Sequence, residues 1–537
     1  MSNFLKISIT LVLAMILLQT TRLYAEEYVE GLSHWPELTL QRALERGLNK
    51  NLELRIETLN VPIGQESVIV EDANFDPVAE VFTSTQYQRT PATAALSENQ
   101  FTRERRYEGE ASLSKRFRFG LDGRLSARTS RVTNSSTFDD STVVDLDPQY
   151  RSFLVLDLTQ PLLRDFGTAV NTTDVRIAEN RLQQATYRTL SRAQRLVADI
   201  EITYYEMAQA IQAYSYRIES RDLAQQLLAG NREKFDVGLI PISEVQEAET
   251  AVASRDEQVL AARQQVETVG NRLRDLLEIN REDPMSREFL RTELLPGTDQ
   301  VFPEMEEALP LALDSRPDLA QQRLEIASRD IRLKFDKNQT LPRLDLEGTL
   351  GANGLSGEER NLTIAGVGSG SNPYDGNYFD SVDSLAQGNG YEWFVGARFS
   401  YPLGNREAES TYRRSGMEKQ QAIYSLKRLE TTVETEVIEG LIAVKRSLER
   451  VKVAGRFESL AEKTLSQEME RLQEGLSDTF RILDFQDKVI DARIRKITAL
   501  GDYNRGLADL YRATGTNLER LGIVYKVQNQ ETYDATK

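Results

Sequence analysis

Hydrophobic residues spaced three and four positions apart recur over long stretches of this chain and predict long helices. One heptad seam is interrupted only by Arg255 and consists of Val245, Ala248, Val252, Val259, Ala262, Val266, Val269 and Leu273. A shift of 237 positions turns it into a second set: Ile482, Phe485, Val489, Lys496, Ala499, Tyr503, Gly506 and Leu510. Because a seam of about four heptads requires partner helices along its whole length, we predict helices packed side by side.

Each seam follows another long helical stretch. Between Gly167 and Gly230 the chain has neither Gly nor Pro, and a helix over most of that span would reach roughly 90 Å. Its expected core positions are Leu196, Ile200, Thr203, Met207, Ala210 and Tyr214. The corresponding positions later in the chain are Val437, Leu441, Val444, Leu448 and Val451.

Short breaks separate the paired helices. In Glu233–Thr250, Gly238 and Pro241 interrupt the helical pattern, and Ser243 can start a new helix. The same arrangement recurs in Arg471–Val489, where Gly475 takes the place of Gly238. We therefore predict two helical hairpins in a duplicated architecture.

Alternation with period two marks a second kind of element. It appears in the segments Arg343–Gly351, Arg151–Gln160 and Tyr391–Tyr401, and we expect a long polar loop, Gly351–Gly390, after the first of them. Strands that are apolar on one face fit either a membrane β-barrel or a half-exposed soluble sheet. The segment Tyr107–Thr133 predicts a further hairpin, and the sequence leaves open whether it lies in a barrel or above it.

The duplication gives the domain organisation. Pro77 aligns with Pro342, and Pro161 aligns with Pro402, so helix, strands and helical hairpin recur in the same order. The first helix of each half is expected from Leu38 to about Ser67 and from Pro303 to about Asn338. We predict a signal peptide at 1–25, repeats at 26–290 and 291–525, and a C-terminal tail at 526–537.

The N-terminus predicts export. Lys6 precedes the apolar run Ile7–Leu18, and a small residue, Ala25, offers a cleavage point. An uncleaved anchor is the alternative interpretation, although the run is too short to span a membrane as a helix. We therefore expect the mature chain in the periplasm or beyond it, and any membrane insertion must use strands.

Composition narrows the classes of function. The chain has 537 residues, a formal net charge of −17, no cysteine and one histidine, His34. The acidic balance disfavours nucleic-acid binding, and thiolate or multi-histidine metal sites are excluded. Paired carboxylates are inevitable among 83 acidic residues, but no nucleophile motif or phosphate loop accompanies them. We expect no catalysis, no cofactor and no bound metal.

The predicted strands cannot close on themselves. About four strands per chain would leave unpaired edges, which hydrocarbon does not tolerate, so the chain should assemble as a ring. Three copies would supply about twelve strands, while symmetry alone also permits two or four copies.

Several of these segments resemble the TolC-like outer-membrane efflux proteins over about Leu38 to Val524. The resemblance rests on LTLQRALERGLNKNLELR and its copy MEEALPLALDSRPDLAQQRLEI, and on the turn segments VGLIPISEVQEAE and EGLSDTFRILDFQD. It implies an α+β membrane protein: a homotrimeric β-barrel in outer-membrane lipid, continued by a long periplasmic α-helical barrel. It also implies a periplasmic adaptor protein and an inner-membrane transporter as partners.

The resemblance also implies functional residues. Asp484 matches an acidic position of the periplasmic gate, Arg481 departs from the family pattern, and Asp478 lies nearby. We predict that attraction between Arg481 and Asp484 of adjacent chains favours the closed gate. The alternative for each is a solvated helix face. The turn residues expected to contact the adaptor are Gly238, Leu239, Gly475 and Leu476. The alternative for these is plain closure of a helix–turn–helix.

The expected function is a passive exit duct of a tripartite efflux or type I secretion system. A periplasmic helical-hairpin adaptor or scaffold is the competing class, but it leaves the paired strands unexplained. The sequence does not separate drugs, metal ions and polypeptides as cargo.

Overall fold

The computed structural model describes residues 10–11, 37–91, 101–135, 145–283, 285, 290–360, 372–388 and 390–526. The chain divides into two compact units. The helical unit contains the described residues up to Gly64, of Leu182–Leu324, and from Ile423 onward. The sheet unit contains those of Gln65–Arg181 and Glu325–Ala422. Both halves of the chain contribute to both units.

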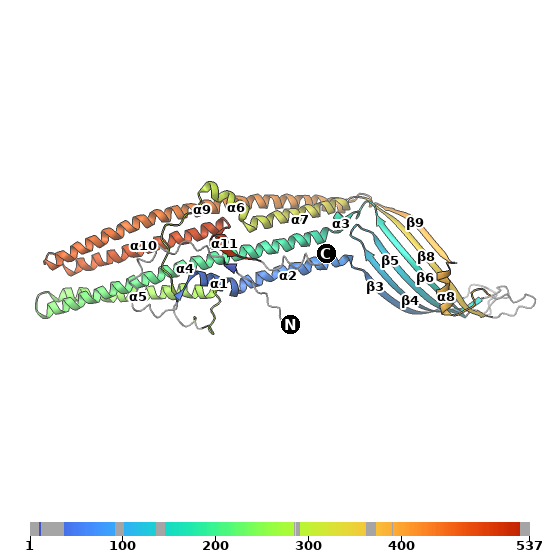
Figure 1. Cartoon of the computed structure of the whole chain (residues 1–537), viewed down its shortest axis with the longest axis horizontal. Coiled ribbons are helices and arrows are strands. Elements are labelled where there is room, and N and C mark those ends of the chain that lie inside the picture. The colour runs from blue at the N-terminus through green and yellow to red at the C-terminus, as the bar shows by residue number, and fades with distance from the viewer. Residues whose placement is uncertain are drawn as a thin grey trace, which may run out of the picture. The chain divides into compact units, whose positions relative to one another are not determined.

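Two helical hairpins dominate the helical unit, and four helices belong to both units because they cross the boundary between them. The hairpins are α4 (Thr173–Asp236) with α5 (Ile242–Leu276), and α9 (Arg406–Gln473) with α10 (Thr479–Ala513) (Figure 1). The other helices are α1 (Leu40–Lys50), α2 (Leu52–Asp72), α3 (Thr168–Asn171), α6 (Met305–Ser315), α7 (Pro317–Gln339), α8 (Tyr378–Gln387) and α11 (Asn517–Arg520), with the short 3₁₀ helix η2 (Ala73–Phe75).

The sequence predicted one continuous helix at Leu38–Ser67 and another at Pro303–Asn338, and each of them is broken into two. Asn51 ends α1, and its side-chain oxygen accepts a hydrogen bond from the Leu54 backbone N–H at 3.0 Å, which starts α2. Between α6 and α7, Arg316 is extended because it precedes Pro317, and this proline opens α7.

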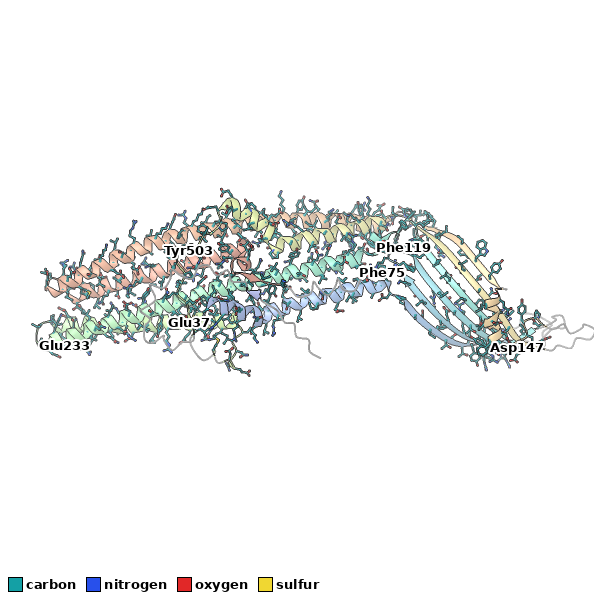
Figure 2. The ribbon with its side chains drawn as sticks, in the orientation of Figure 1. Glu37, Phe75, Phe119, Asp147, Glu233 and Tyr503 are labelled. Carbon is teal, nitrogen blue, oxygen red and sulfur yellow. The ribbon has the colours of Figure 1, made fainter. Side chains whose placement is uncertain are left out.

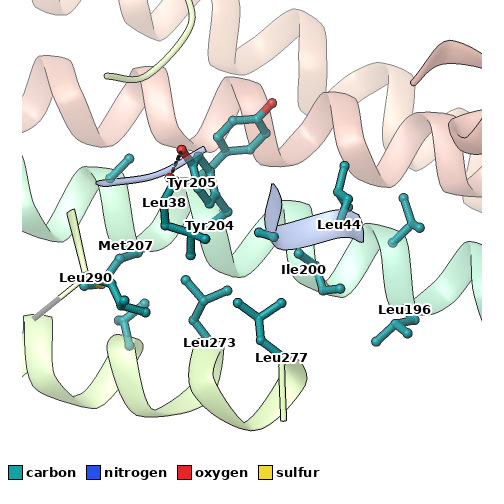
Figure 3. Packing of buried hydrophobic residues seen from close by; sticks show 14 of the residues in the cluster. Leu38, Leu44, Leu196, Ile200, Tyr204, Tyr205, Met207, Leu273, Leu277 and Leu290 are labelled. Carbon is teal, nitrogen blue, oxygen red and sulfur yellow. Dashed lines mark hydrogen bonds between the residues drawn. The ribbon is translucent and has the colours of Figure 1, made fainter. Parts of the chain in front are cut away.

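Around α1 and α4 the predicted helical seams form a buried core (Figure 3). Ile200, Met207 and Leu273 are almost fully buried there. The Tyr204 hydroxyl donates to the Leu38 carbonyl at 2.8 Å, and burial raises the pKa of Tyr204. Two small pairings lie in this unit: β2 (Glu37–Leu38) runs parallel to β7 (Arg291–Thr292), and β1 (Thr10–Leu11) runs antiparallel to β10 (Ile523–Val524).

The sheet unit contains a six-stranded antiparallel sheet in the order β3-β4-β5-β6-β8-β9 (Figure 1). Its strands are β3 (Val78–Pro91), β4 (Phe101–Arg116), β5 (Asp122–Ser135), β6 (Asp145–Pro161), β8 (Arg343–Arg360) and β9 (Tyr391–Ser400). The sequence predicted about four strands. The difference is the hairpin over Tyr107–Thr133, which the structure places inside the sheet as β4 and β5.

The sequence predicted a loop over Gly351–Gly390, but part of this stretch is regular structure. Its first part extends β8, and α8 follows, with a capping box in which Asn377 and Asp380 bond each other's backbone N–H groups. Gly388, with φ of 70°, ends α8 in the left-handed region. The Asn377-x-x-Asp380 spacing was the sequence signal for this helix. The stretch 361–371 lies outside the described residues.

Candidate functional site

One face of the sheet carries an apolar band that crosses all six strands. A single row of paired residues crosses it, which we call the apolar row: Ala79, Leu113, Leu125, Leu156, Leu350 and Trp393. Leu350 is 59% exposed and Trp393 is 69% exposed in the isolated chain. Neighbouring residues of the same face, Val81 and Val395, are exposed as well. A monomeric soluble protein rarely leaves so broad an apolar surface in water.

The opposite face carries paired charges. Arg124 and Arg128 of β5 each lie 3.0 Å from Glu110 of β4, and Arg398 of β9 lies 2.7 Å from Glu347 of β8. Asp345, almost fully buried, pairs with Arg343 at 2.6 Å. A membrane barrel with an aqueous lumen has an apolar face toward lipid and a polar or charged face toward the lumen, and the two faces of this sheet fit that pattern.

Aromatic residues lie at both ends of this sheet. Figure 2 shows Phe75 and Phe119 at one end and Asp147 at the other. The rings of Phe117 and Phe119 are 5.6 Å apart at the first end, and Tyr150 packs edge-on against Tyr378 toward the second. Membrane barrels carry aromatic residues at both membrane interfaces, and these two positions agree with that pattern.

The helical hairpins end in two matching turns, residues 237–241 and residues 474–478. Gly238 and Gly475 both have φ of 75°, where an L side chain is strained. The next N–H in each turn reaches back to the end of the preceding helix: Leu239 to the Lys234 carbonyl at 2.9 Å, and Leu476 to the Arg471 carbonyl at 2.8 Å. This is the Schellman motif, and it explains the paired glycines that the sequence singled out.

Both turns expose large apolar side chains. Leu239 is 75% exposed and Leu476 is 63% exposed. Val237 and Phe480 beside them are 69% and 65% exposed. Figure 2 places Glu233 close to the end of the α4–α5 hairpin.

The three residues expected at the gate lie together at the start of α10, on its exposed side. Asp478 caps the helix by accepting a hydrogen bond from the Arg481 backbone N–H at 2.9 Å. The Arg481 guanidinium lies 3.4 Å from the buried Glu468 carboxylate of α9, and Asp484 pairs with Lys488 at 2.6 Å. Neither Glu468 nor Lys488 was predicted from the sequence, and both pairs form within one chain.

Arg255, the one break in the first heptad seam, is the largest buried side chain near these turns. Its guanidinium donates to the Ser220 carbonyl at 2.9 Å, to Gln486 at 3.1 Å and to the Leu483 carbonyl at 3.3 Å. It also pairs with Asp487 at 2.9 Å. Arg255 thereby joins α5 to α4 and α10. A charged residue in an otherwise apolar seam was the signal for this network.

Further polar contacts tie α10 to its neighbours. Asn231 of α4 donates to Thr479 at 3.0 Å, and Thr479 donates to Glu244 of α5 at 2.9 Å. Arg493 pairs with Glu219 of α4 at 2.8 Å and with Glu462 of α9 at 3.0 Å. The helix bearing the expected gate is thus held at several points.

A groove of about 560 Å³ runs between α5 and α10 and is lined by Phe480, Asp484 and Asp487, among others. Within the described ranges, no cluster of three or more His, Cys, Asp and Glu residues could hold a metal ion. No helix in the described part of the chain is long and apolar enough to cross a membrane.

The two-faced sheet and the long helical hairpins define a protomer of an oligomeric membrane channel. The family model of the outer membrane efflux protein matches residues 116–277 and 308–516. The chain belongs to the outer membrane efflux protein family, as the sequence resemblance had implied.

Solved structures share this fold. The outer-membrane channel OprN matches with a TM-score of 0.62 at 16% identity, covering 89% of both chains. The Campylobacter jejuni CmeC outer membrane channel gives 0.60 at 16%, covering 89% of this chain and 86% of the other. The open state of the Neisseria gonorrhoeae MtrE outer membrane channel gives 0.57 at 14%, covering 89% of both. No curated protein matches the chain.

Membership of the family confirms the fold class and the location. The protein is a trimeric outer-membrane β-barrel continued by a long α-helical barrel in the periplasm, and it serves as an outer-membrane efflux channel.

Proposed function

We propose that this chain is the passive exit duct of a tripartite efflux or type I secretion system and catalyses no reaction itself. The observation that carries the proposal is the six-stranded sheet, which has an apolar band on one face and ion pairs on the other. A periplasmic adaptor or scaffold lies in water, where the apolar face of such a sheet would have no lipid to cover it.

A periplasmic adaptor protein and, through it, an inner-membrane transporter are the proposed partners. The docking surface consists of the two turns, with Leu239 and Leu476 as exposed apolar contacts and Gly238 and Gly475 as the residues that shape the backbone. Apolar side chains on a rigid turn lose little conformational freedom on binding, so they suit such a contact.

The gate is proposed at the start of α10, with Asp484 and Arg481 on its exposed face and Asp478 fixing the helix start. The sequence predicted attraction between Arg481 and Asp484 of adjacent chains. Each of them already has a partner in its own chain, so we expect the closed state to depend on the pairs with Glu468 and Lys488 too.

The gate can be tested in planar bilayers. Replacing Arg481 and Asp484 together by Ala should raise single-channel conductance and weaken its dependence on salt, because exposed pairs contribute about 0.2–1 kcal/mol each. The matched control replaces Arg446 and Glu449, an exposed pair of α9, by Ala. Parental conductance in the gate variant at every salt concentration would remove these residues from the gate.

Residues 1–25 are proposed as a signal peptide, ahead of repeats at 26–290 and 291–525 and a tail at 526–537. Cleavage after Ala25 would remove β1 and its two-residue pairing with β10. N-terminal sequencing of the outer-membrane protein should begin near Glu26. An intact Met1 would contradict the cleavage.

The partner assignment has its own test. The chain has no cysteine, so Leu239→Cys and Leu476→Cys each provide a single crosslinking site. Crosslinking in intact cells should capture the adaptor, whereas Val453→Cys, an exposed residue on α9, should not. Equal capture from all three positions would contradict docking at the turns.

A further inference from the structure

We propose that the β4–β5 hairpin is part of the membrane wall, so that three chains of six strands close a barrel of eighteen strands with a wide exit. The proposal rests on the trimeric duct described above. It concerns residues 101–135, which were absent from the expected count of about twelve strands.

Full-length pairing places the hairpin in the wall. β4 pairs with β3 from Val78↔Ser114 to Pro91↔Phe101, and β5 pairs with β6 from Asp122↔Thr159 to Val132↔Gln149. The hairpin therefore stands between β3 and β6, and these two strands do not pair with each other (Figure 1). A hairpin lying above the membrane would leave β3 and β6 as neighbours.

Two residue pairs of the hairpin, Leu113 with Leu125 and Ala111 with Ala127, continue the apolar band of the sheet. Leu113 and Leu125 lie in the apolar row and are 49% and 44% exposed, and Ala111 pairs with Ala127 on the same face. An exposed apolar face on β4 and β5 is costly in water and favourable against lipid.

On the lumen side the hairpin brings charges that neutralise one another. Arg128 lies 3.0 Å from Glu110 and 3.3 Å from Glu108, and Arg124 lies 3.0 Å from Glu110. Arg106 pairs with Glu104 at 2.8 Å toward the other end. The lumen face of the hairpin is hydrophilic, and its paired charges produce no strong positive or negative electrostatic field. It therefore excludes neither cations nor anions.

Geometry permits closure. Adjacent strands of the sheet are antiparallel throughout, and their number is even, so β9 of one chain runs antiparallel to β3 of the next. Pairing these edges removes the open edges that hydrocarbon would not tolerate. Without the hairpin, the remaining four strands would also run antiparallel to their neighbours, so strand direction alone does not distinguish twelve strands from eighteen.

The added hairpins widen the exit. Barrel diameter grows roughly linearly with strand number, so eighteen strands give about one and a half times the diameter of twelve. The cross-section is then about twice as large. The cargo class that this suits is bulky hydrophilic solute, polypeptide included, and the barrel itself does not act as the size filter.

Cysteine pairs in the full-length protein distinguish the two arrangements. Ala79→Cys with Leu113→Cys should form a disulfide, because facing Cα atoms of paired strands are about 4.5–5.5 Å apart. Ala79→Cys with Leu156→Cys should not, since three strand spacings of about 4.8 Å separate them. Mass spectrometry of peptides from outer-membrane trimers detects either disulfide.

A disulfide between positions 79 and 156, without one between 79 and 113, would overturn the proposal while leaving the trimeric duct intact. Absence of the protein from the outer membrane would instead overturn the duct. A variant lacking residues 101–144 adds an independent measurement. Electron microscopy of its trimers, viewed end-on, should show a barrel narrower by about a third. An unchanged diameter would contradict the proposal.

Discussion

The buried guanidinium of Arg255 lies 2.9 Å from the carboxylate of Asp487, joining the return helices α5 and α10 of the two hairpins. The Arg255 side chain is 2% exposed, whereas Asp487 is 58% exposed. The arginine is thus held mainly by protein carbonyls and Gln486. This contact links the two helical hairpins beside the proposed gate.

Arg255→Met should loosen α10. The change removes hydrogen bonds from a charged donor, each contributing about 1.5–3 kcal/mol, and Met restores much of the apolar volume. We expect faster amide hydrogen exchange in α10 and a higher open probability in planar bilayers. Arg263→Met, at an exposed pair on the same helix, serves as the control. Equal exchange in the two variants would show that Arg255 does not hold α10.

Glu468→Gln should make the turn at residues 474–478 more mobile. The Glu468 side chain is 7% exposed, lies 3.4 Å from Arg481 and accepts a hydrogen bond from Ser477 at 2.7 Å. Neutralising it weakens both contacts, so trypsin should cleave after Arg471 and Arg481 several-fold faster. Glu449→Gln, an exposed acid on the same helix, should leave the cleavage rate unchanged. Cleavage at the parental rate in Glu468→Gln would contradict the assignment.

Replacing glycine by alanine should have opposite effects on stability in the turns and in the helices. Gly238→Ala and Gly475→Ala should each destabilise their hairpin by about 1 kcal/mol, because both residues have φ of 75°. Gly230→Ala and Gly455→Ala, in helices with nothing within 4 Å of the added methyl group, should stabilise by about 0.5–1 kcal/mol. Thermal melting of solubilised protein measures both, and shifts of the same sign would refute the distinction.

Acid should weaken the contact between α7 and α9 in the sheet unit. Hydrogen bonds from Lys334 and Lys419 lower the pKa of Asp330 below its usual 3.8. A lowered carboxyl pKa stabilises the fold above about pH 4, and this stability is lost as the pH falls through the folded value. Asp330→Asn should therefore flatten the dependence of the urea midpoint on pH below 4. An unchanged slope would show that Asp330 makes no such contribution.

Much of the fold followed from periodicity. The seams at Val266 and Leu273, and at Val489 and Leu510, are buried as predicted, because a heptad pattern specifies one helix face directly. The paired turns followed from Gly238 and Gly475, since backbone strain restricts the residue type there.

The sequence did not predict the rest because it depended on neighbours far along the chain. Leu113 and Leu125 alternate weakly with charged residues that look solvent-exposed in sequence, and only the pairing of Arg124 and Arg128 with Glu110 shows that these charges share one face. Likewise, Arg255 looks like a defect in a seam until its acceptors on α4 and α10 are seen.

The mass of the particle extracted from outer membranes in detergent tests the central claim most directly. The duct account predicts three copies of the chain per particle, because the open edges of β3 and β9 must pair with other copies. A stable monomer, or recovery of the chain only in the inner membrane, would contradict it.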